Sequence, residues 1–251
     1  MSAATDDAIR FEGVTKRFGD RVILDEVTLG IPRGKTTVLL GPSGTGKSTL
    51  IRLAVGLMRP EGGRVVVLDT DVTTAPRDTL LALRRRMGML FQDGALFGSL
   101  TVTENVGFPL RHVMKLDVDE TKKRVESLLG LVGLPGVGER TPDALSGGQR
   151  KRVALARAIA LEPEIVFFDE PTSGLDPQTS ASIDALVNDM QARLGLTFVV
   201  ITHDTESAKT IAHQVGMLHE GKLRAYGPRA DVWASADPVV RAFLDRVPLR
   251  G

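Results

Sequence analysis

One segment of the chain fits the phosphate-binding spacing G-x-x-x-x-G-K-[ST], and its residues are Gly41, Pro42, Ser43, Gly44, Thr45, Gly46, Lys47, Ser48 and Thr49. An apolar run at 36–40 precedes it and a run of helix formers at 49–57 follows it, which is the strand–loop–helix context that such a segment requires. The glycines allow backbone angles that are closed to other residues, so that successive amides can face phosphate oxygens at the positive end of a helix. The segment therefore predicts an α/β fold that binds a nucleoside triphosphate.

Two side chains at the end of this segment extend the prediction to a metal ion. We expect Lys47 to reach the outer phosphates, because it carries a positive charge on a long flexible side chain directly after the last glycine. We expect the Ser48 hydroxyl to ligate Mg²⁺ that is bound together with the nucleotide.

The composition excludes several other classes of protein. The chain has 251 residues, no cysteine and a formal net charge of +1. It can therefore form neither a disulfide framework nor a cysteine zinc site, and no charge excess indicates a nucleic-acid partner. Residues 1–13 lack the basic and then apolar pattern of a signal peptide, and no apolar run approaches the roughly 18 residues of a membrane helix. We expect a soluble protein whose membrane role comes through a partner.

Alternating apolar and polar positions at 8–32 predict short antiparallel strands with a turn at Gly19-Asp20. Phe18 lies just before this turn. An aromatic ring at a loop offers a flat face to a nucleotide base, although a hydrophobic plug at a strand end is the alternative. A second hairpin is expected around Glu220-Gly221 and a last helix at 238–247.

The middle of the chain reads as a helix at 80–87, a strand ending at Gln92, and a helical insertion at 101–136. Gln92 is either an ordinary loop residue or, at a strand edge beside the phosphates, a ligand for the metal or the attacking water. In the insertion, Val125, Leu128, Leu129 and Val132 are spaced as one apolar helix face.

Three further positions carry polar groups where phosphate chemistry needs them. The small residues Ser146, Gly147 and Gly148, followed by Gln149, begin a helix, so they form either a second anion site or an ordinary N-cap. Asp169 and Glu170 end a buried strand at 165–168, where Asp169 can hold the metal and Glu170 can polarise water. His203 follows another buried strand and can bond a phosphate or the water.

Together these motifs resemble those of ATP-binding cassette (ABC) ATPases over about residues 8–247. The matching segments occur in the family's order: Walker A (41–49), the Q-loop (Gln92), the signature (145–149), Walker B with the catalytic Glu (165–170), the D-loop (173–176) and the switch histidine (His203). The resemblance implies an ATPase with Glu170, His203 and Gln92 as catalytic residues. It also implies that Ser48, Gln92 and Asp169 hold Mg²⁺, and that Phe18, the loop 41–49, Ser146–Gln149 and Asp176 contact ATP. The family more often has Tyr where this chain has Phe18, so stacking survives and a hydroxyl contact is lost.

The resemblance further implies a single ABC-type P-loop NTPase domain of class α/β, with a small antiparallel β-subdomain and a helical subdomain. We expect a RecA-like core with the β-subdomain at about 8–92 and 160–247, and a helical subdomain at about 93–159 that ends in the signature. It implies a head-to-tail homodimer, in which each ATP lies between one chain's loop at 41–49 and the other chain's Ser146–Gln149. A second helix terminus opposite the loop would supply further N–H donors and exclude water.

Within the family, residues 89–111 and 237–245 are similar to the ATPases of Mla and Mce lipid transporters. This similarity implies phospholipid transport through a separate multi-span permease that docks near Gly94–Leu100, with an Mce-domain lipid-binding protein as a further partner. The expected location is the cytoplasmic face of the inner (plasma) membrane. An importer of amino acids or other small solutes is the alternative. A soluble cassette acting on DNA or ribosomes is disfavoured by the single cassette and the lack of charge excess, and a simple kinase leaves the signature without a role.

Overall fold

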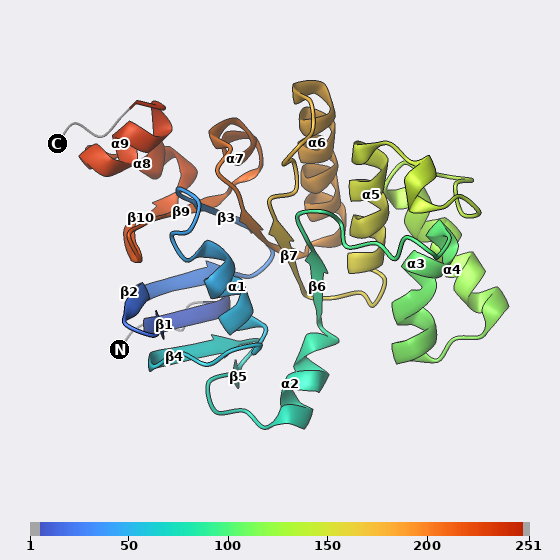
Figure 1. The fold of residues 1–251 in the computed structure, drawn as a ribbon, viewed down its shortest axis with the longest axis horizontal. Helices are drawn as coiled ribbons and strands as arrows, with labels where there is room; N and C mark the ends of the chain where they lie inside the picture. The colour runs from blue at the N-terminus through green and yellow to red at the C-terminus, as the bar shows by residue number, and fades with distance from the viewer. Residues whose placement is uncertain (1–5, 248–251) are drawn as a thin grey trace. The chain divides into compact units, whose positions relative to one another are not determined.

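The computed structural model describes residues 6–247 and divides the chain into two compact units. Unit 1 extends to Arg84 and resumes at Thr197, whereas unit 2 comprises Arg85–Leu196. Figure 1 labels their helices and strands. Within residues 6–247, no helix combines the length and apolar character that crossing a membrane requires.

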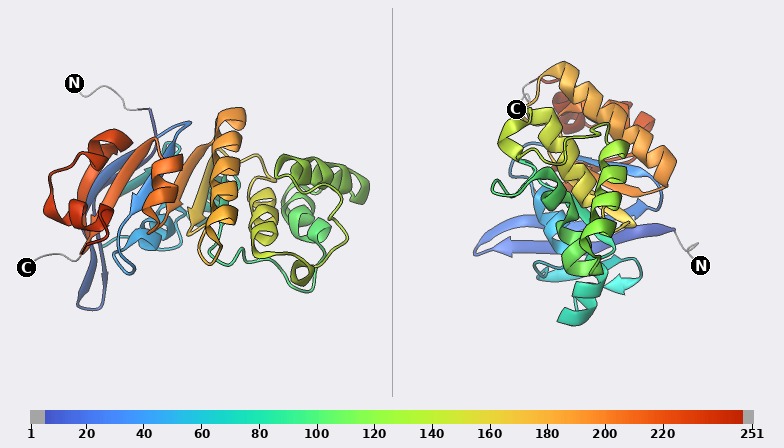
Figure 2. Two further views of the ribbon diagram at one scale, coloured as in Figure 1. Left: turned by 90° about the horizontal axis from the view of Figure 1, so that it is seen from above. Right: turned by 90° about the vertical axis from the view of Figure 1, so that its right-hand side faces the viewer.

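Unit 1 contains an antiparallel sheet with the strand order β2-β1-β4-β5. Its strands are β1 (Asp7–Phe18), β2 (Arg21–Pro32), β4 (Gly62–Val67) and β5 (Thr70–Asp71). The turn between β1 and β2 lies at residues 19–20, as predicted, and Phe18 pairs with Arg21 beside it. The prediction of short strands was wrong, because β1 and β2 each continue for 12 residues as one long hairpin (Figure 2).

The other strands of unit 1 lie in the order β10-β9-β3-β8. They are β3 (Thr36–Leu40), β8 (Thr197–Ile201), β9 (Gln214–His219) and β10 (Lys222–Pro228). The strands β8 and β9 run parallel to β3, and the predicted hairpin joins β9 to antiparallel β10. Every residue of β3 and β8 is buried, which is typical of parallel strands covered on both faces.

Among residues 6–247, unit 1 has five helices, of which three were predicted: the helix expected at 49–57 spans 47–54, and the helices expected at 80–87 and 238–247 also have shifted ends. The helices of unit 1 are α1 (Lys47–Ala54), α2 (Arg77–Arg84), α7 (Thr205–Ile211), α8 (Arg229–Trp233) and α9 (Pro238–Leu244). The helix expected at 80–87 begins and ends earlier, because Met87 already belongs to a strand. The last helix ends at Leu244 rather than 247, since the apolar residues that anchor it, Val240 and Ala242, lie before that point.

Unit 2 pairs two parallel strands, β6 (Met87–Leu90) and β7 (Ile165–Asp169), and adds several helices. The helices are α3 (Val102–Pro109), a π-helical turn η1 (Leu110–Met114), α4 (Val118–Leu131), a 3-10 turn η2 (Pro142–Ala144), α5 (Gly147–Ala158) and α6 (Pro177–Leu194). The helical insertion expected at 101–136 thus consists of α3, η1 and α4. Lys115 takes a left-handed backbone with φ 62°, which ends η1, and the Asp117 side chain then caps α4.

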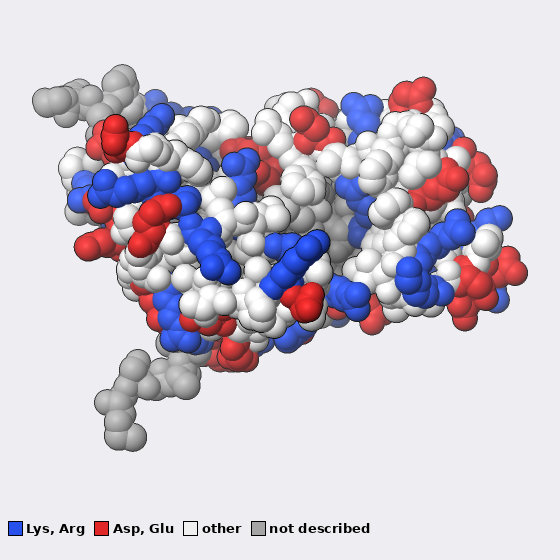
Figure 3. Space-filling model, turned by 60° about the horizontal axis from the view of Figure 1, so that its bottom comes forward, with Lys and Arg blue, Asp and Glu red and all other residues white. Residues whose placement is uncertain are grey.

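The apolar face predicted for α4 is confirmed, since Val125, Leu128, Leu129 and Val132 are all buried. The helices α3, α4 and α5 pack together, so this face is covered inside unit 2. On the molecular face drawn in Figure 3, Lys and Arg side chains are interspersed with Asp and Glu, in keeping with the near balance of charges in the sequence.

Candidate functional site

The segment 41–49 forms a loop between buried β3 and α1, and two of its glycines are required by close contacts. Gly41 has φ 144°, and a Cβ atom there would lie 2.2 Å from the carbonyl oxygen of Leu218. Gly46 has φ 102°, and a Cβ atom there would lie 2.7 Å from Leu24 Cδ2. No other residue type fits these two positions without moving the backbone.

The ammonium of Lys47 lies inside this loop. Lys47 is 6% exposed, and its Nζ donates to the carbonyl oxygens of Gly41 at 2.6 Å and Pro42 at 2.8 Å. Gly46, which is the N-cap of α1, offers no side chain that could bond the first amides of that helix. A buried cation and a helix N-terminus without a capping side chain fit a phosphate group, so the loop has the geometry of a phosphate site.

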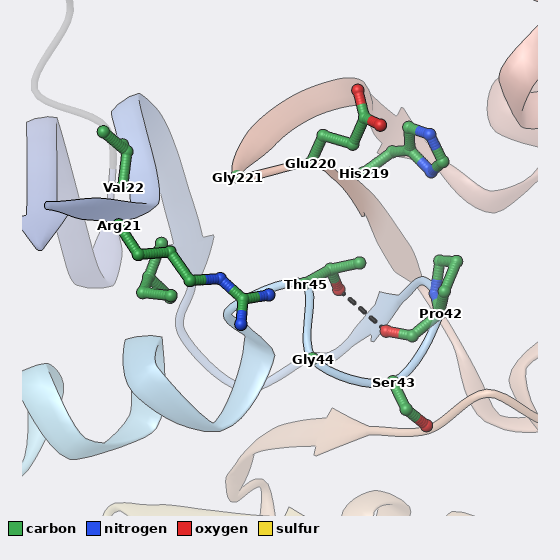
Figure 4. Close-up of a pocket in the computed structure, with 10 residues that line it drawn as sticks. Arg21, Val22, Pro42, Ser43, Gly44, Thr45, His219, Glu220 and Gly221 are labelled. Carbon is green, nitrogen blue, oxygen red and sulfur yellow. Dashed lines mark hydrogen bonds between the residues drawn. The ribbon is translucent and has the colours of Figure 1, made fainter. Parts of the chain in front are cut away.

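A cavity of about 250 Å³ lies beside the loop (Figure 4). It is bounded by three segments of unit 1: Arg21–Ile23 of β2, Pro42–Thr45 of the loop, and His219–Gly221 at the β9–β10 turn. The Arg21 side chain extends from β2 toward the loop, whereas the Glu220 carboxylate points away from it. A backbone hydrogen bond of 2.9 Å from Asp25 N to Gly221 O ties β2 to the turn.

Phe18 lies at the end of β1 with 50% of its surface exposed, so it is not the hydrophobic plug of the alternative interpretation. The Lys16 ammonium lies 5.4 Å from the centre of the Phe18 ring. Lys16 is itself held by Glu61 Oε1 at 2.6 Å and by the Arg59 carbonyl at 2.8 Å. The hydrogen bond from Lys16, followed by one from the Arg17 amide, lowers the pKa of Glu61, so this partner is a carboxylate at neutral pH.

His203 lies two residues after the end of β8, which runs beside β3 with Leu39 opposite Ile201. The amide of Thr202 also donates to the Leu39 carbonyl at 3.3 Å. Since β3 leads into the loop at 41–49, unit 1 brings His203 to the same carboxyl edge of its strands as the phosphate loop. The next residue, Asp204, caps α7 by accepting from the amide of Glu206 at 3.0 Å.

Unit 2 brings Gln92 and the Asp169-Glu170 pair to one edge in the same way. Leu90 of β6 lies opposite Phe168 of β7, so the residues after both strands leave the pair at the same end. Glu170 lies beyond the end of β7 and has a left-handed backbone with φ 51°. The strand therefore ends between the two carboxylates, which lets their side chains take different directions.

The oxygen groups of Asp169, Gln92 and Ser48 are the hard donors that Mg²⁺ prefers. Among the described residues, no group of three His, Cys, Asp or Glu side chains is arranged to hold a metal by itself. The chemistry of these three side chains is compatible with the predicted Mg²⁺, and their joint role as its ligands stays a prediction.

Ser146 and Asp176 both serve as N-caps. Ser146 Oγ accepts from the Gln149 amide at 3.2 Å, and Gln149 Oε1 accepts from the Ser146 amide at 3.0 Å, forming a capping box at the start of α5. Asp176 accepts from the amide and the hydroxyl of Thr179, and these bonds lower the pKa of Asp176. The N-cap interpretation of Ser146 is confirmed. Ser146 is also exposed, so it is accessible to an anion, but the anion-binding role stays a prediction.

The buried side chain of Asn105 helps to fix the loop Gly94–Leu100. Asn105 is fully buried and accepts from the Phe97 amide at 2.8 Å, while its Nδ2 donates to the carbonyls of Phe97 and Leu100. Phe97 is 44% exposed and packs on Phe108 with ring centres 5.0 Å apart. An ordered loop thus presents an aromatic surface to solvent.

Sequence reasoning missed the residues that complete these sites from distant positions. Arg21, His219 and Glu220 line the cavity beside the phosphate loop. Among the described residues, the buried Nδ1 of His219 has no hydrogen-bond partner. The sequence did predict the β9–β10 hairpin that carries His219 and Glu220. Only the packing of this hairpin against β2 shows that its turn reaches the phosphate loop.

Comparison with known proteins identifies the family. The family model described as ABC transporter matches residues 24–173, which is more than half of the chain. The chain belongs to the ABC transporter family. It is similar to a probable ribonucleotide transport ATP-binding protein, mkl, of Mycobacterium leprae, at 44% identity over 95% of this chain and 69% of that protein. The match thus spans about two thirds of the length of this mycobacterial relative.

Two other relatives carry different names. The intermembrane phospholipid transport system ATP-binding protein MlaF of Escherichia coli K12 is 39% identical over 98% of the cassette and 92% of its own length. The methionine import ATP-binding protein MetN of Cutibacterium acnes is 46% identical over 91% of the cassette and 63% of its own length.

Among solved structures, the cassette resembles an ATP-binding cassette crystallised as a dimer in a post-hydrolysis state with ADP and Pi. The TM-score is 0.79 at 32% identity, covering 88% of this chain and 98% of that one. The predicted ABC-type P-loop fold and the ATPase activity are confirmed by the family membership and this structural match. Cassettes of this family bind ATP, form dimers and work with membrane permeases.

Proposed function

We propose that this cassette hydrolyses ATP to power phospholipid transport through a separate membrane permease. The observation that carries this proposal is the match to MlaF, which alone among the relatives described above spans nearly the whole of both chains. Percent identity does not decide among the cargoes named for the relatives, because an ATPase subunit does not touch the cargo. An Mce-domain lipid-binding protein is part of the same proposal, as is a location at the cytoplasmic face of the inner membrane.

Amino-acid import is the second candidate, favoured by the 46% identity to MetN. The two candidates differ in the molecule that the assembled transporter holds. We expect the cassette to co-purify with a multi-span permease, and mass spectrometry of that complex to find bound phospholipid. Bound methionine, with no lipid above the level of a detergent blank, would decide for import.

For the reaction itself, we propose that Lys47, Ser48, Gln92, Asp169, Glu170 and His203 act on one nucleotide. Lys47 binds the outer phosphates, while Asp169, with Ser48 and Gln92, holds Mg²⁺, which supplies charge neutralisation at the phosphates. Glu170 accepts the proton of the attacking water, and His203 bonds the γ-phosphate or that water. These roles are supported by the common strand edge of Gln92 and Glu170 in unit 2, and by that of His203 and the phosphate loop in unit 1.

Glu170→Gln and Asp169→Asn should separate the two carboxylates. Glu170→Gln keeps the shape and removes the base, so hydrolysis should fall by about a hundredfold to ten-thousandfold while ATP still binds. Asp169→Asn should instead weaken Mg²⁺-dependent binding itself. Size-exclusion chromatography with Mg-ATP should show a persistent dimer for Glu170→Gln and none for Asp169→Asn. Wild-type hydrolysis by Glu170→Gln would place the base elsewhere, with His203 the next to test.

We further propose that the cassette acts as a homodimer with each ATP between the loop 41–49 of one chain and Ser146–Gln149 of the other. Within each chain, we propose a core at about 8–92 and 160–247 and a helical subdomain at about 93–159. Phe18, Asp176 and the signature residues then complete the nucleotide contacts.

The permease is proposed to dock on the ordered aromatic loop Gly94–Leu100. Phe97→Asp places a charge on this surface and should abolish co-purification with the permease while nucleotide binding stays intact. A matched control is Phe18→Asp, which replaces a similarly exposed aromatic ring at the proposed nucleotide site with a carboxylate. This variant should still co-purify with the permease. A Phe97→Asp complex of normal yield would contradict the proposed dock.

A further inference from the structure

Lys151 is a buried lysine in the first half of α5 whose side chain the sequence motifs do not explain. It is 6% exposed, and its ammonium donates to the carbonyl oxygen of Gln92 and, at 3.4 Å, to that of Glu170. One side chain of the helix that begins at the signature therefore contacts the main chain at two of the residues assigned to hydrolysis. Burying a cation is costly unless its surroundings require it.

The surroundings of Lys151 do favour a cation. Burial lowers the pKa of Lys151, and the carboxylates of Asp93, Glu170 and Asp169 oppose this effect. The ammonium thus lies among acidic groups of unit 2 as well as two carbonyls. An apolar side chain of similar length, such as Met, could fill the volume but could not donate to these oxygens.

Both segments that Lys151 contacts have backbones that need support. Glu170 is left-handed with φ 51°, and the loop after Gln92 contains a left-handed Ala95 with φ 48°. Non-glycine residues persist in this region only where neighbouring groups hold them. In the same loop, Arg157 of α5 donates to the carbonyls of Gly94 and Ala95, each at 2.8 Å.

We propose that Lys151 is a positioning residue that fixes the Gln92 loop and the Glu170 turn to each other and to the signature helix. Since the loop continues into Gly94–Leu100, this ammonium gives a movement of the proposed dock a direct route to Glu170. The inference rests on the roles proposed for Gln92 and Glu170. Lys151 acts on them through their main-chain carbonyls.

The test compares steady-state ATP hydrolysis by Lys151→Met with hydrolysis by the wild type. This substitution keeps approximately the length and volume of the side chain but removes the cation. We expect kcat to fall about tenfold or more, with KM and analogue affinity changed less than about threefold, because the phosphate loop is untouched. Lys151→Arg keeps a cation with several donors and should restore kcat to within about threefold of wild type. Hydrogen exchange should rise together at 92–97 and 170–175 in Lys151→Met alone.

Arg152→Met is the matched control, since Arg152 is the adjacent cation on α5 and contacts neither segment. Its guanidinium donates to the Val132 carbonyl at 2.7 Å and to Ser182 Oγ at 2.6 Å. Arg152→Met should lower Tm and leave kcat near wild type. If Lys151 only stabilised the fold, Lys151→Met and Arg152→Met should show the same losses of Tm and kcat. That outcome would overturn the proposal.

Glu170→Gln separates failure of this inference from failure of the proposed function. If Glu170→Gln loses hydrolysis and folded Lys151→Met retains wild-type kcat, only the role of Lys151 is wrong. If Glu170→Gln hydrolyses normally, the proposed chemistry itself is wrong. If Lys151→Met does not fold, the kcat of Lys151→Arg decides. A folded Lys151→Arg variant that is as slow as Glu170→Gln would overturn the proposal, whereas a near-wild-type kcat for Lys151→Arg would support it.

Discussion

At the scale of single residues, Phe18 shows how a neighbour prepares a side chain for binding. The Lys16 ammonium lies over the Phe18 ring, and Lys16 is anchored by Glu61 and the Arg59 carbonyl. A ring that is held in this way loses little side-chain entropy when a base stacks on it. If Phe18 contacts the base as proposed, the half-exposed ring would offer it a fixed surface.

Phe18→Ala should weaken ATP binding by about 1–3 kcal/mol, the usual contribution of an aromatic–base stack. Phe18→Tyr keeps the ring and should bind like wild type. Lys16→Met removes the cation–π contact and the bonds to Glu61 and Arg59 but keeps the ring, so its loss of ATP affinity should be smaller, about 0.5–1 kcal/mol. Titration with a fluorescent ATP analogue measures all three. Equal affinities for Phe18→Ala and Phe18→Tyr would show that the ring does not stack on the base.

At the scale of elements, short polar contacts fix loops and join strands that are distant in sequence. Asn105 orders the loop Gly94–Leu100 from within α3. In unit 1, the hydroxyl of Tyr226 on β10 donates to the Gly30 carbonyl on β2. Burial, with a further contribution from the charge of Asp7, raises the pKa of Tyr226 to about 12.

This contact predicts a loss of stability at alkaline pH. The folded chain favours the neutral phenol, so the contribution is complete below about pH 10, the ordinary pKa, and is lost as pH rises toward 12. Tyr226→Phe should lower the free energy of unfolding by about 1 kcal/mol at neutral pH and flatten the pH dependence between 10 and 12. The contribution at high pH is reduced by solvent, because Tyr226 is 37% exposed.

Tyrosinate absorbance measures this pKa directly, since Tyr226 is the single tyrosine of the chain. The absorbance midpoint should lie near 12 in the folded protein and near 10 in denaturant. A folded midpoint near 10 would show that the hydroxyl is not held by Gly30.

At the scale of the whole molecule, the proposed dimer makes each active site a product of two chains. An inactive Lys47→Ala chain mixed with an inactive Ser146→Ala chain would form mixed dimers with one intact and one doubly damaged site. With random pairing at equal amounts, about half of the dimers are mixed, and each mixed dimer has one intact site out of two. About a quarter of all sites are therefore intact. We therefore expect the mixture to hydrolyse ATP faster than either variant alone.

The control mixes Lys47→Ala with the double variant Lys47→Ala/Ser146→Ala, because no pairing of these chains contains an intact loop. The rate of the test mixture should exceed that of the control mixture. Equal rates, together with a crosslink from Ser146 to nucleotide held by its own chain, would contradict the shared site.

The sequence by itself determined which residues are candidates for ATP binding and hydrolysis, and the local structure around them. The phosphate loop, the strand before Asp169-Glu170 and the hairpin at 219–222 follow from local rules: glycines where the backbone requires them, apolar runs for buried strands, and alternation for exposed ones. Each of these rules acts between residues close in sequence.

The tertiary structure decided what distant residues do for each other. Lys151 reads in the sequence as one more charge in a basic helix, yet packing buries it against the carbonyls of Gln92 and Glu170. Arg21 and His219 likewise reach the phosphate loop only because β2 and the β9–β10 turn meet beside it. These roles depend on burial and on contacts between remote segments, and no local pattern encodes either.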